Sequence, residues 1–316
     1  MPIPAVLFII FNRPHETGAV FRAIRTARPL RLYIAADGPR DGRKGEAELC
    51  AEARRIATDI DWPCEVQTKF RERNLGCRHG PATAIDWFFE NEEEGIILED
   101  DCVPSASFFP YCAELLEHYR DDPRIMCISG DNPRTSTDAL PTSYVFSHYP
   151  LIWGWATWRR AWQLYDANLS NWPAFRDSGR LRLIADHEAF EKYWSEIFDR
   201  TSGQLVDYWD YQWTFSCWLH GGLTCVPSIN LVSNIGFGPD ATHTFDVTDS
   251  RARLQTNELD FPLVHPEFVR CDVGADLSLC EALFGAALRR VNWLERVRRR
   301  VGLRTRLRSA LAHFTR

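Results

Sequence analysis

Short apolar runs alternate with amphipathic segments through about the first 130 residues of the chain. Residues 5–11 form a continuous apolar run of strand length, which Asn12-Arg13-Pro14 terminates, and residues 15–27 then have helical spacing. The same alternation predicts four more strands, over residues 30–36, 65–70, 95–98 and 124–129, and three more helices, over residues 46–60, 78–90 and 107–119. Strands that alternate with helices form right-handed βαβ crossovers. We therefore expect an α/β fold with a mostly parallel central sheet flanked by helices.

The alternation weakens from about residue 144, where the chain becomes rich in Trp. Nine of the 12 Trp residues lie between residues 153 and 218. The sequence contains no evident repeat and no linker rich in Pro, Gly or Ser. We expect three parts: residues 1–143 with the regular sheet, residues 144–265 with a less regular, Trp-rich structure, and residues 266–316 as a C-terminal extension.

Polar residues follow three of the predicted strands. Arg13 comes after the first strand, Asp37 after the second, and Glu99-Asp100-Asp101 after the strand over residues 95–98. Ligands of parallel α/β sheets bind beyond the carboxyl ends of the strands. We therefore expect these residues, which are far apart in the sequence, to converge at one edge of the sheet.

The triplet Glu99-Asp100-Asp101 indicates a cation site. Neighbouring carboxylates raise one another's pKa unless positive charge offsets them, and hard oxygen ligands suit Mg²⁺ or Mn²⁺. The alternative is a solvated strand end, in which Asp101 or Ser105 caps the helix that follows.

Asp37 and two arginines indicate a nucleotide site. Asp37-Gly38-Pro39 is also an ordinary turn. At a shared sheet edge, however, Asp37 can accept a hydrogen bond from a base N–H, while Arg13 or Arg78 binds phosphate oxygens. The chain has neither a G-x-G-x-x-G loop nor a P-loop motif, so metal and side chains would have to hold a diphosphate. This combination points to nucleotide-sugar chemistry.

The net charge of -6 is unevenly distributed. Residues 289–316 contain ten Arg and one Glu, a net charge of +9, which leaves -15 on the remaining 288 residues. An acidic body is a poor partner for nucleic acid, which we therefore exclude. The ten Cys residues form no CxxC pair, so free and mostly buried thiols are expected.

The basic tail predicts an amphipathic helix. Its apolar residues recur at helical spacing with Arg between them, a pattern typical of segments that bind anionic membrane surfaces. The alternative is a terminal helix that packs on the acidic body. The sequence shows neither a transmembrane stretch nor a signal peptide, so we expect a cytoplasmic protein, peripheral at the inner face of the membrane.

Several segments, taken in order, resemble glycosyltransferases of the GT-A fold. The run from Gly95 to Phe109 is similar to the EDD form of the DxD motif, as found in the N-acetylglucosaminyltransferase I type and its bacterial relatives. The other similar segments are Pro4 to Pro14, Ala35-Ala36-Asp37-Gly38, Trp153-Gly154-Trp155 followed by an expected helix to Asp166, Trp209-Asp210, and Ile235 to Gly238 followed by Thr242-His243. Together these segments span roughly residues 3 to 245.

The resemblance implies roles for the donor side of the site. Asp101, as the final acid of the triplet, would bind Mn²⁺, while Glu99 and Asp100 would contact the donor sugar or ribose. His243 would be a ligand to the metal or the diphosphate.

It also implies roles for the acceptor side. Asp210 would be the catalytic base and Trp155 would line the acceptor pocket. The chain departs from the eukaryotic enzymes after Asp210, where Tyr211-Gln212-Trp213 replaces a second acid, so Asp207 remains a competitor for the base role.

The function implied is an inverting, metal-dependent glycosyltransferase. It would move a sugar from a nucleotide-diphosphate donor, a UDP-sugar being the expected form, to a glycan or lipid-linked acceptor in bacterial surface polysaccharide synthesis. Residues 1–143 would bind the donor and residues 144–265 the acceptor. The alternatives are a sugar-nucleotidyltransferase and a non-catalytic carbohydrate-binding protein with a degenerate site.

Overall fold

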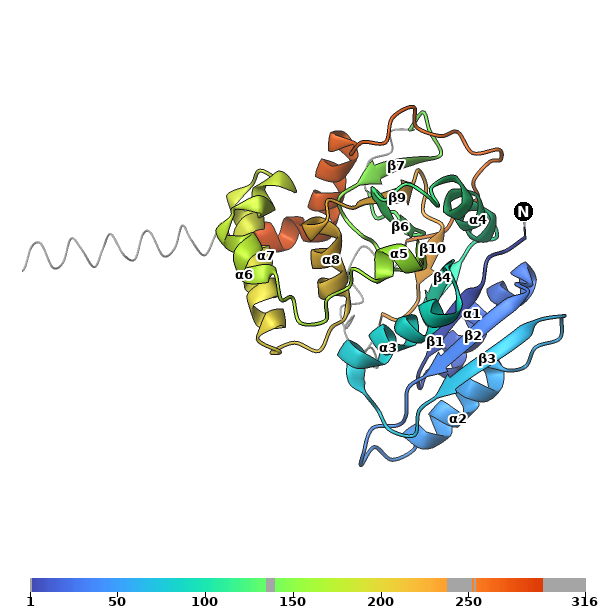
Figure 1. Cartoon of the computed structure of the whole chain (residues 1–316). Helices are drawn as coiled ribbons and strands as arrows, with labels where there is room; N and C mark the ends of the chain where they lie inside the picture. Colours follow the sequence, from blue (N-terminus) through green and yellow to red (C-terminus); the bar gives the residue numbers. More distant parts are fainter. Residues whose placement is uncertain (1, 135–139, 238–251, 253, 292–316) are drawn as a thin grey trace, which may run out of the picture.

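The computed structural model describes residues 2–134, 140–237, 252 and 254–291, and a single eight-stranded sheet runs through it (Figure 1). The strands lie in the order β3-β2-β1-β4-β8-β6-β9-β7. Their bounds are β1 (Val6–Ile10), β2 (Arg31–Ala36), β3 (Glu65–Phe70), β4 (Glu94–Glu99), β6 (Ile125–Ser129), β7 (Tyr144–Ser147), β8 (Trp155–Trp158) and β9 (Leu223–Pro227). Strands β1 to β4 pair in parallel, as do β6 and β9, whereas β8 and β7 run antiparallel to their neighbours. The expected α/β class, with a mostly parallel sheet flanked by helices, is confirmed.

Helices cover both faces of the sheet. The helices on one face are α1 (Pro14–Ala27), α2 (Glu46–Ala57) and α4 (Phe108–His118), and those on the other are α3 (Gly76–Asn91), α5 (Arg159–Trp162) and α8 (Asp210–Leu219). Alternate side chains of β1 serve the two faces, because successive residues of a strand point to opposite sides. Val6 and Phe8 belong to the first core and Leu7 to the second.

A third apolar cluster holds the Trp-rich part together. It joins α6 (Trp172–Asp177), the 3₁₀ turn η1 (Arg180–Leu183), α7 (Glu188–Ser202), α8 and the helical segment 273–291. Within it, the rings of Trp194 and Trp218 meet edge to face at 4.7 Å. Aromatic edge-to-face packing supplies a core where regular strands are few. Most of the Trp residues are therefore core residues.

The segment after Trp153 differs from the sequence expectation. We expected a helix from here to Asp166, but Trp155–Trp158 forms β8 in the middle of the sheet and the helix is limited to α5. Gly154, with a φ of 63°, makes the turn into the strand, a conformation that favours glycine. Hydrogen bonds to β4 on one side and β6 on the other then hold this segment as a strand. The spacing of residues within the segment does not reveal these partners.

A short two-stranded sheet lies directly after the acidic triplet. It pairs β5 (Cys102–Pro104) with β10 (Val232–Asn234) in antiparallel orientation. The Ile235 N–H also donates to the Asp101 carbonyl at 2.8 Å. This pairing holds the segment after β10 against the end of β4. Among the described residues, no helix combines the length and apolarity needed to cross a bilayer.

Candidate functional site

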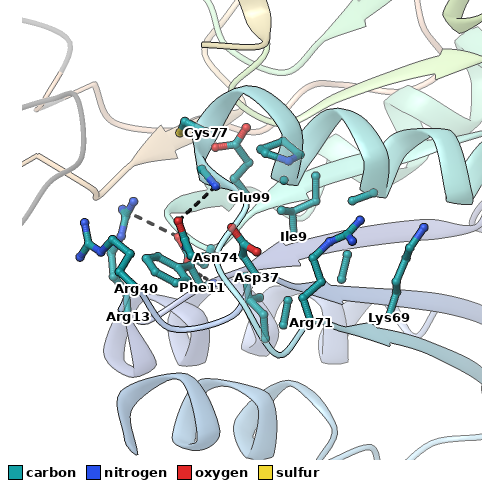
Figure 2. Close-up of a pocket in the computed structure, with 18 of the residues that line it drawn as sticks. Ile9, Phe11, Arg13, Asp37, Arg40, Lys69, Arg71, Asn74, Cys77 and Glu99 are labelled. Atoms are coloured by element: carbon teal, nitrogen blue, oxygen red, sulfur yellow. Dashed lines mark hydrogen bonds and ion pairs between the residues drawn. The ribbon is translucent and has the colours of Figure 1, made fainter. Parts of the chain in front are cut away.

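A pocket opens at the carboxyl ends of β1, β2 and β4 (Figure 2). Its wall includes Arg13, Asp37, Glu99 and Asp100. The convergence expected from the sequence is therefore observed, since parallel strands end at the same edge of the sheet.

The acidic triplet is organised by Arg13 and by the end of β1. The Arg13 guanidinium donates to Asp101 Oδ2 at 2.7 Å and lies 3.8 Å from Asp100 Oδ1. The Phe11 N–H donates to Asp100 Oδ2 at 2.9 Å. Arg13 is positioned by Pro14, which begins α1 and turns the chain immediately after β1.

The triplet carries more negative charge than its surroundings offset. Burial raises the pKa of Glu99, and the charges of Asp101 and Asp100 raise it further. Burial also raises the pKa of Asp100, although Arg13 acts against it. Within the described part of the chain, Arg13 is the residue that forms ion pairs with these acids. The site thus favours binding of additional positive charge.

The donor set fits a hard divalent cation. Carboxylate oxygens are the ligands that Mg²⁺ and Mn²⁺ prefer, and one Arg against three acids leaves an excess charge that such an ion would match. Gly236 packs so closely on the Asp101 carboxylate that a Cβ there would collide with it. A larger residue at position 236 would thus displace Asp101. His243 lies outside the described residues.

Asp37 lines the pocket and also holds a neighbouring loop. Its carboxylate accepts the Leu75 N–H at 2.9 Å and the Gly38 N–H at 2.9 Å. Burial raises the pKa of Asp37, although these backbone donors act in the opposite direction. The Asn74 amide donates to the Gly38 carbonyl at 3.0 Å and ties the same loop to the end of β2.

The pocket wall also contains three basic residues that the sequence analysis did not identify. Arg40 lies on the same side as Arg13, and Lys69 and Arg71 lie on the other side of Asp37 (Figure 2). The Arg71 guanidinium donates to Thr83 Oγ1 at 2.8 Å. Lys69 and Arg71 are two residues apart at the end of β3, so the alternation of side chains along a strand could have identified them as a pair on one face.

Arg78 does not contribute its guanidinium to the pocket, in contrast to the expectation. The side chain is buried, and it donates to the Ala167 carbonyl at 2.7 Å and the Thr201 carbonyl at 3.1 Å. Both carbonyls belong to the Trp-rich part of the chain. Arg78 is thus a buried link between α3 and that part, because its donors are already used there.

The two acids proposed for the base role occupy different environments. Asp207 lines the first pocket and accepts the Cys77 N–H at 3.1 Å and the Arg78 N–H at 2.8 Å, which satisfies free donors at the start of α3. Asp210 begins α8 and lines a second pocket. Burial raises the pKa of Asp210 to about 6, although the backbone N–H groups of Asp210 and Tyr211 act against it.

The second pocket combines carboxylates with aromatic side chains. Its wall includes Asp131 and Asp210 and the rings of Trp153, Tyr193, Trp194, Tyr211, Trp218 and Phe284. The two pockets are neighbours, because Asp207 in the wall of the first and Asp210 in the wall of the second are only three residues apart. Cys77 lies among the same acids: burial raises its pKa, and Glu99, Asp207 and Asp210 raise it further.

Trp155 does not line an acceptor pocket, so that expectation is corrected. Its side chain is 0% exposed and packs between Trp209, at 5.8 Å, and Trp213, at 5.5 Å. Its place in a central strand explains the burial, because helices cover that face of the sheet. Trp153, two residues earlier and outside the strand, lines the second pocket instead.

No protein-family model matches the chain, and a search of curated proteins finds none that matches. Among solved structures, apo mouse xyloside xylosyltransferase 1 is 11% identical, covering 71% of this chain and 84% of that one with a TM-score of 0.34. The inositol-1-phosphate CTP transferase of T. maritima is 8% identical, covering 52% and 75% with a TM-score of 0.33. A UDP-glucose pyrophosphorylase complexed with UDP-glucose is 11% identical, covering 46% and 62% with a TM-score of 0.25. These scores are too low to support an inference about activity, which must come from the site itself.

Proposed function

We propose that this protein is an inverting, metal-dependent glycosyltransferase that uses a nucleotide-diphosphate sugar, a UDP-sugar being the expected donor. The observation that carries the proposal is the pairing of two adjacent pockets. One gathers Arg13, Asp37, Glu99 and Asp100 at the sheet edge, with Asp101 paired to Arg13 beside it, and the other holds Asp210 among aromatic rings. The sequence segments that resemble GT-A glycosyltransferases contribute to both pockets.

The first pocket would bind the donor. Asp37 would accept a base N–H, and Arg13 would donate to the diphosphate oxygens through its planar fork. Glu99 and Asp100 would contact the sugar or the ribose. Lys69 and Arg71 would add positive charge around an anionic ligand, whereas Arg40 is already paired with Glu46. Residues 1–143 would therefore form the donor-binding part.

Asp101 would hold the Mn²⁺ or Mg²⁺, with His243 as a further ligand. When bound, such a cation supplies Lewis-acid stabilisation of the negative charge on a departing diphosphate. Asp101 pairs with Arg13 through Oδ2, so Oδ1 would be the oxygen that binds the ion. Arg13 has further N–H groups for the diphosphate, so neighbouring residues would serve both ligands.

The second pocket would bind the acceptor. Aromatic faces such as that of Trp153 pack well against the apolar faces of sugars. The Asp210 carboxylate would take the proton from the acceptor hydroxyl as its oxygen bonds to the anomeric carbon. The bond between that carbon and the diphosphate oxygen breaks, and the nucleoside diphosphate leaves with the electron pair. Attack from the side opposite the leaving group inverts the anomeric centre.

The acceptor would be a glycan or a lipid-linked glycan in surface polysaccharide synthesis. The basic tail would place a cytoplasmic enzyme at the inner face of the membrane, where lipid-linked acceptors lie. Residues 144–265 would then form the acceptor part, and residues 266–316 would carry the membrane-binding segment.

Calorimetry with a panel of nucleotide-diphosphate sugars, with and without Mn²⁺, tests the proposal. We expect at least one donor to bind more tightly with the metal, and Asp101→Asn to remove that difference. Asp41→Asn, an exposed acid in the turn before α2, is the matched control and should retain it. If neither Mn²⁺ nor Mg²⁺ alters the affinity for any donor, the proposal is wrong.

Product analysis separates the alternative functions. A glycosyltransferase releases nucleoside diphosphate from the donor when an acceptor is present. A sugar-nucleotidyltransferase instead releases pyrophosphate from a nucleoside triphosphate and a sugar 1-phosphate. A carbohydrate-binding protein with a degenerate site releases neither product.

A further inference from the structure

A cluster of three different metal-ligating side chains includes none of the acids that line the two pockets. His148, Cys271 and Asp276 each present one ligand atom, and these atoms all lie within 4.8 Å of one another. His148 Nδ1 is 2.7 Å from Asp276 Oδ2, and the Cys271 thiol donates to the same oxygen at 3.0 Å. The cluster is remote in sequence from the acidic triplet and shares no residue with it.

The fold brings these residues together through backbone contacts. Cys271 forms a bridge with Phe146 of β7, and the Asp272 N–H donates to the Phe146 carbonyl at 2.8 Å. His148 follows β7 directly, and its own N–H donates to Asp276 Oδ1 at 3.2 Å. Asp276 lies in the first turns of the helical segment 273–291, which begins beside β7 (Figure 1, orange-red). The cluster therefore sits where this helix joins the sheet.

The ligand types select a different cation from the acidic triplet. Imidazole, thiolate and carboxylate form the tetrahedral sites of Zn²⁺, with bonds of about 2.0 to 2.3 Å. Hard cations such as Mg²⁺ and Mn²⁺ prefer sites made of oxygens alone. The three ligand atoms lie within 4.8 Å of one another, so they need to close in only slightly to bind one ion with bonds of about 2.0 to 2.3 Å. The His148 side chain is 26% exposed, which gives an ion and a water ligand a route from solvent.

We propose that His148, Cys271 and Asp276 form a zinc site that fixes the helical segment 273–291 to β7. Zn²⁺ replaces the thiol proton of Cys271 and takes the position between His148 and Asp276, and a water molecule completes the tetrahedron. The segment carries Leu283 and Phe284, which line the second pocket. Zinc would thus shape that pocket from a distance, whatever the reaction performed there.

Metal content and Co²⁺ spectroscopy test the site. The full-length protein is stripped with a chelator and then equilibrated with Zn²⁺ or Co²⁺. We expect about one Zn²⁺ per chain and a higher melting temperature with zinc, because an ion that binds only the folded state stabilises it. Co²⁺ should give the intense visible bands of a tetrahedral site and a near-ultraviolet band from the Co²⁺–thiolate bond.

Cys271→Ser removes the thiolate with little change in volume. We expect it to remove the thiolate band and to weaken zinc binding by at least about tenfold. Cys64→Ser, at a partly buried thiol near the start of β3, is the matched control and should keep both. Asp101→Asn should also keep both, because it affects only the oxygen-ligand site.

Two results would overturn the proposal. One is a wild-type protein that retains no zinc after dialysis and melts at the same temperature with and without the ion. The other is a Cys271→Ser variant, folded by circular dichroism, whose Co²⁺ spectrum matches that of the wild type. In either case the cluster is a hydrogen-bonded link between the helix and β7.

Discussion

At the scale of single residues, the two candidate bases Asp207 and Asp210 differ in their burial. Asp207 is exposed, and two backbone N–H groups donate to its carboxylate. Asp210 lies in an aromatic pocket, where burial raises its pKa to about 6. A base with a pKa just below neutral is ionised at pH 7 and still basic enough to take a proton. We therefore expect Asp210, rather than Asp207, to act as the base.

Replacing Asp210 with Asn should lower turnover by about 10²- to 10⁴-fold, the usual contribution of a general base, and leave donor affinity unchanged. In the wild type, kcat/KM should fall as the pH drops below about 6, because the base is then protonated. The Asp210→Asn variant should not show this fall in kcat/KM at low pH, the acid limb of the pH profile. Rates measured from pH 5 to 9 with a fixed donor check both expectations.

The stability of the same variant provides the control. The pKa of Asp210 is higher in the folded state than its ordinary value, so its ionisation opposes folding as the pH rises from about 4 through 6. Asn carries no charge, and the variant should be at least as stable as the wild type at pH 8. If Asp207→Asn rather than Asp210→Asn removes the acid limb, the base assignment is reversed.

We expect the buried Arg78 side chain to stabilise the fold, because its guanidinium donates to two backbone carbonyls. Arg78→Ala leaves the Ala167 and Thr201 carbonyls without their charged donor, so we expect a loss of about 3 kcal/mol in the free energy of unfolding. Urea unfolding measures it. Arg55→Ala, at an exposed Arg paired with Glu52, should change stability little. A variant at position 78 with unchanged stability but weakened donor binding would restore the phosphate role.

At the scale of elements, the position of β8 in the middle of the sheet buries the side chain of Trp155 completely. Trp155 packs against the rings of α5 and α8, and within the described residues its indole N–H has no hydrogen-bond partner. Trp155 therefore stabilises the fold through burial of its ring and not through a hydrogen bond. Strand β8 lies between β4, whose end lines the first pocket, and β6, while Trp153, two residues before β8, lines the second pocket.

Trp155→Ala should cost about 3 to 5 kcal/mol of unfolding free energy, the range for removing a buried Trp. Trp155→Phe keeps much of the packing and discards an unpaired N–H, so its loss should be smaller. Chemical denaturation of both variants gives the comparison. The expectation fails if Trp155→Ala unfolds like the wild type while raising the acceptor KM more than the donor KM.

At the scale of the whole molecule, charge separates the body from the tail. The tail, residues 289–316, carries +9 and the rest of the chain -15. Most of the tail lies outside the described residues, so its membrane role stays a prediction. An Arg near an anionic surface contributes about 1 kcal/mol, and ions screen the attraction. Without the tail, the negatively charged body has no net electrostatic attraction to an anionic bilayer.

Sedimentation with phosphatidylserine-containing vesicles tests this role. The full chain should sediment at low salt and dissociate as the salt concentration rises. Removal of residues 289–316 should abolish sedimentation, because the acidic body is repelled. Vesicles of neutral phosphatidylcholine alone are the control. Binding that persists after truncation would contradict the membrane role and favour a tail that packs on the body.

The regular half of the fold could be predicted because each signal in it is local. All five strands and four helices expected before residue 130 are observed, since strand and helix periodicities are properties of short segments. Convergence of Arg13, Asp37 and the acidic triplet also followed from the sequence, because parallel strands place their ends together. The resemblance to GT-A glycosyltransferases identified Asp210 as a candidate base, but the sequence did not predict the pocket around it.

The tertiary structure decided which side chains are buried and which distant residues contact one another. It placed Trp155 in a central strand, directed Arg78 away from the pocket, brought Lys69 and Arg71 into it and joined His148 to Asp276 across 128 positions. The sequence alone determined the order of elements, the acidic sheet edge and the opposed charges of body and tail, because composition and short-range periodicity contain them. Burial and partner choice arise only when distant segments pack, and no local pattern encodes that packing.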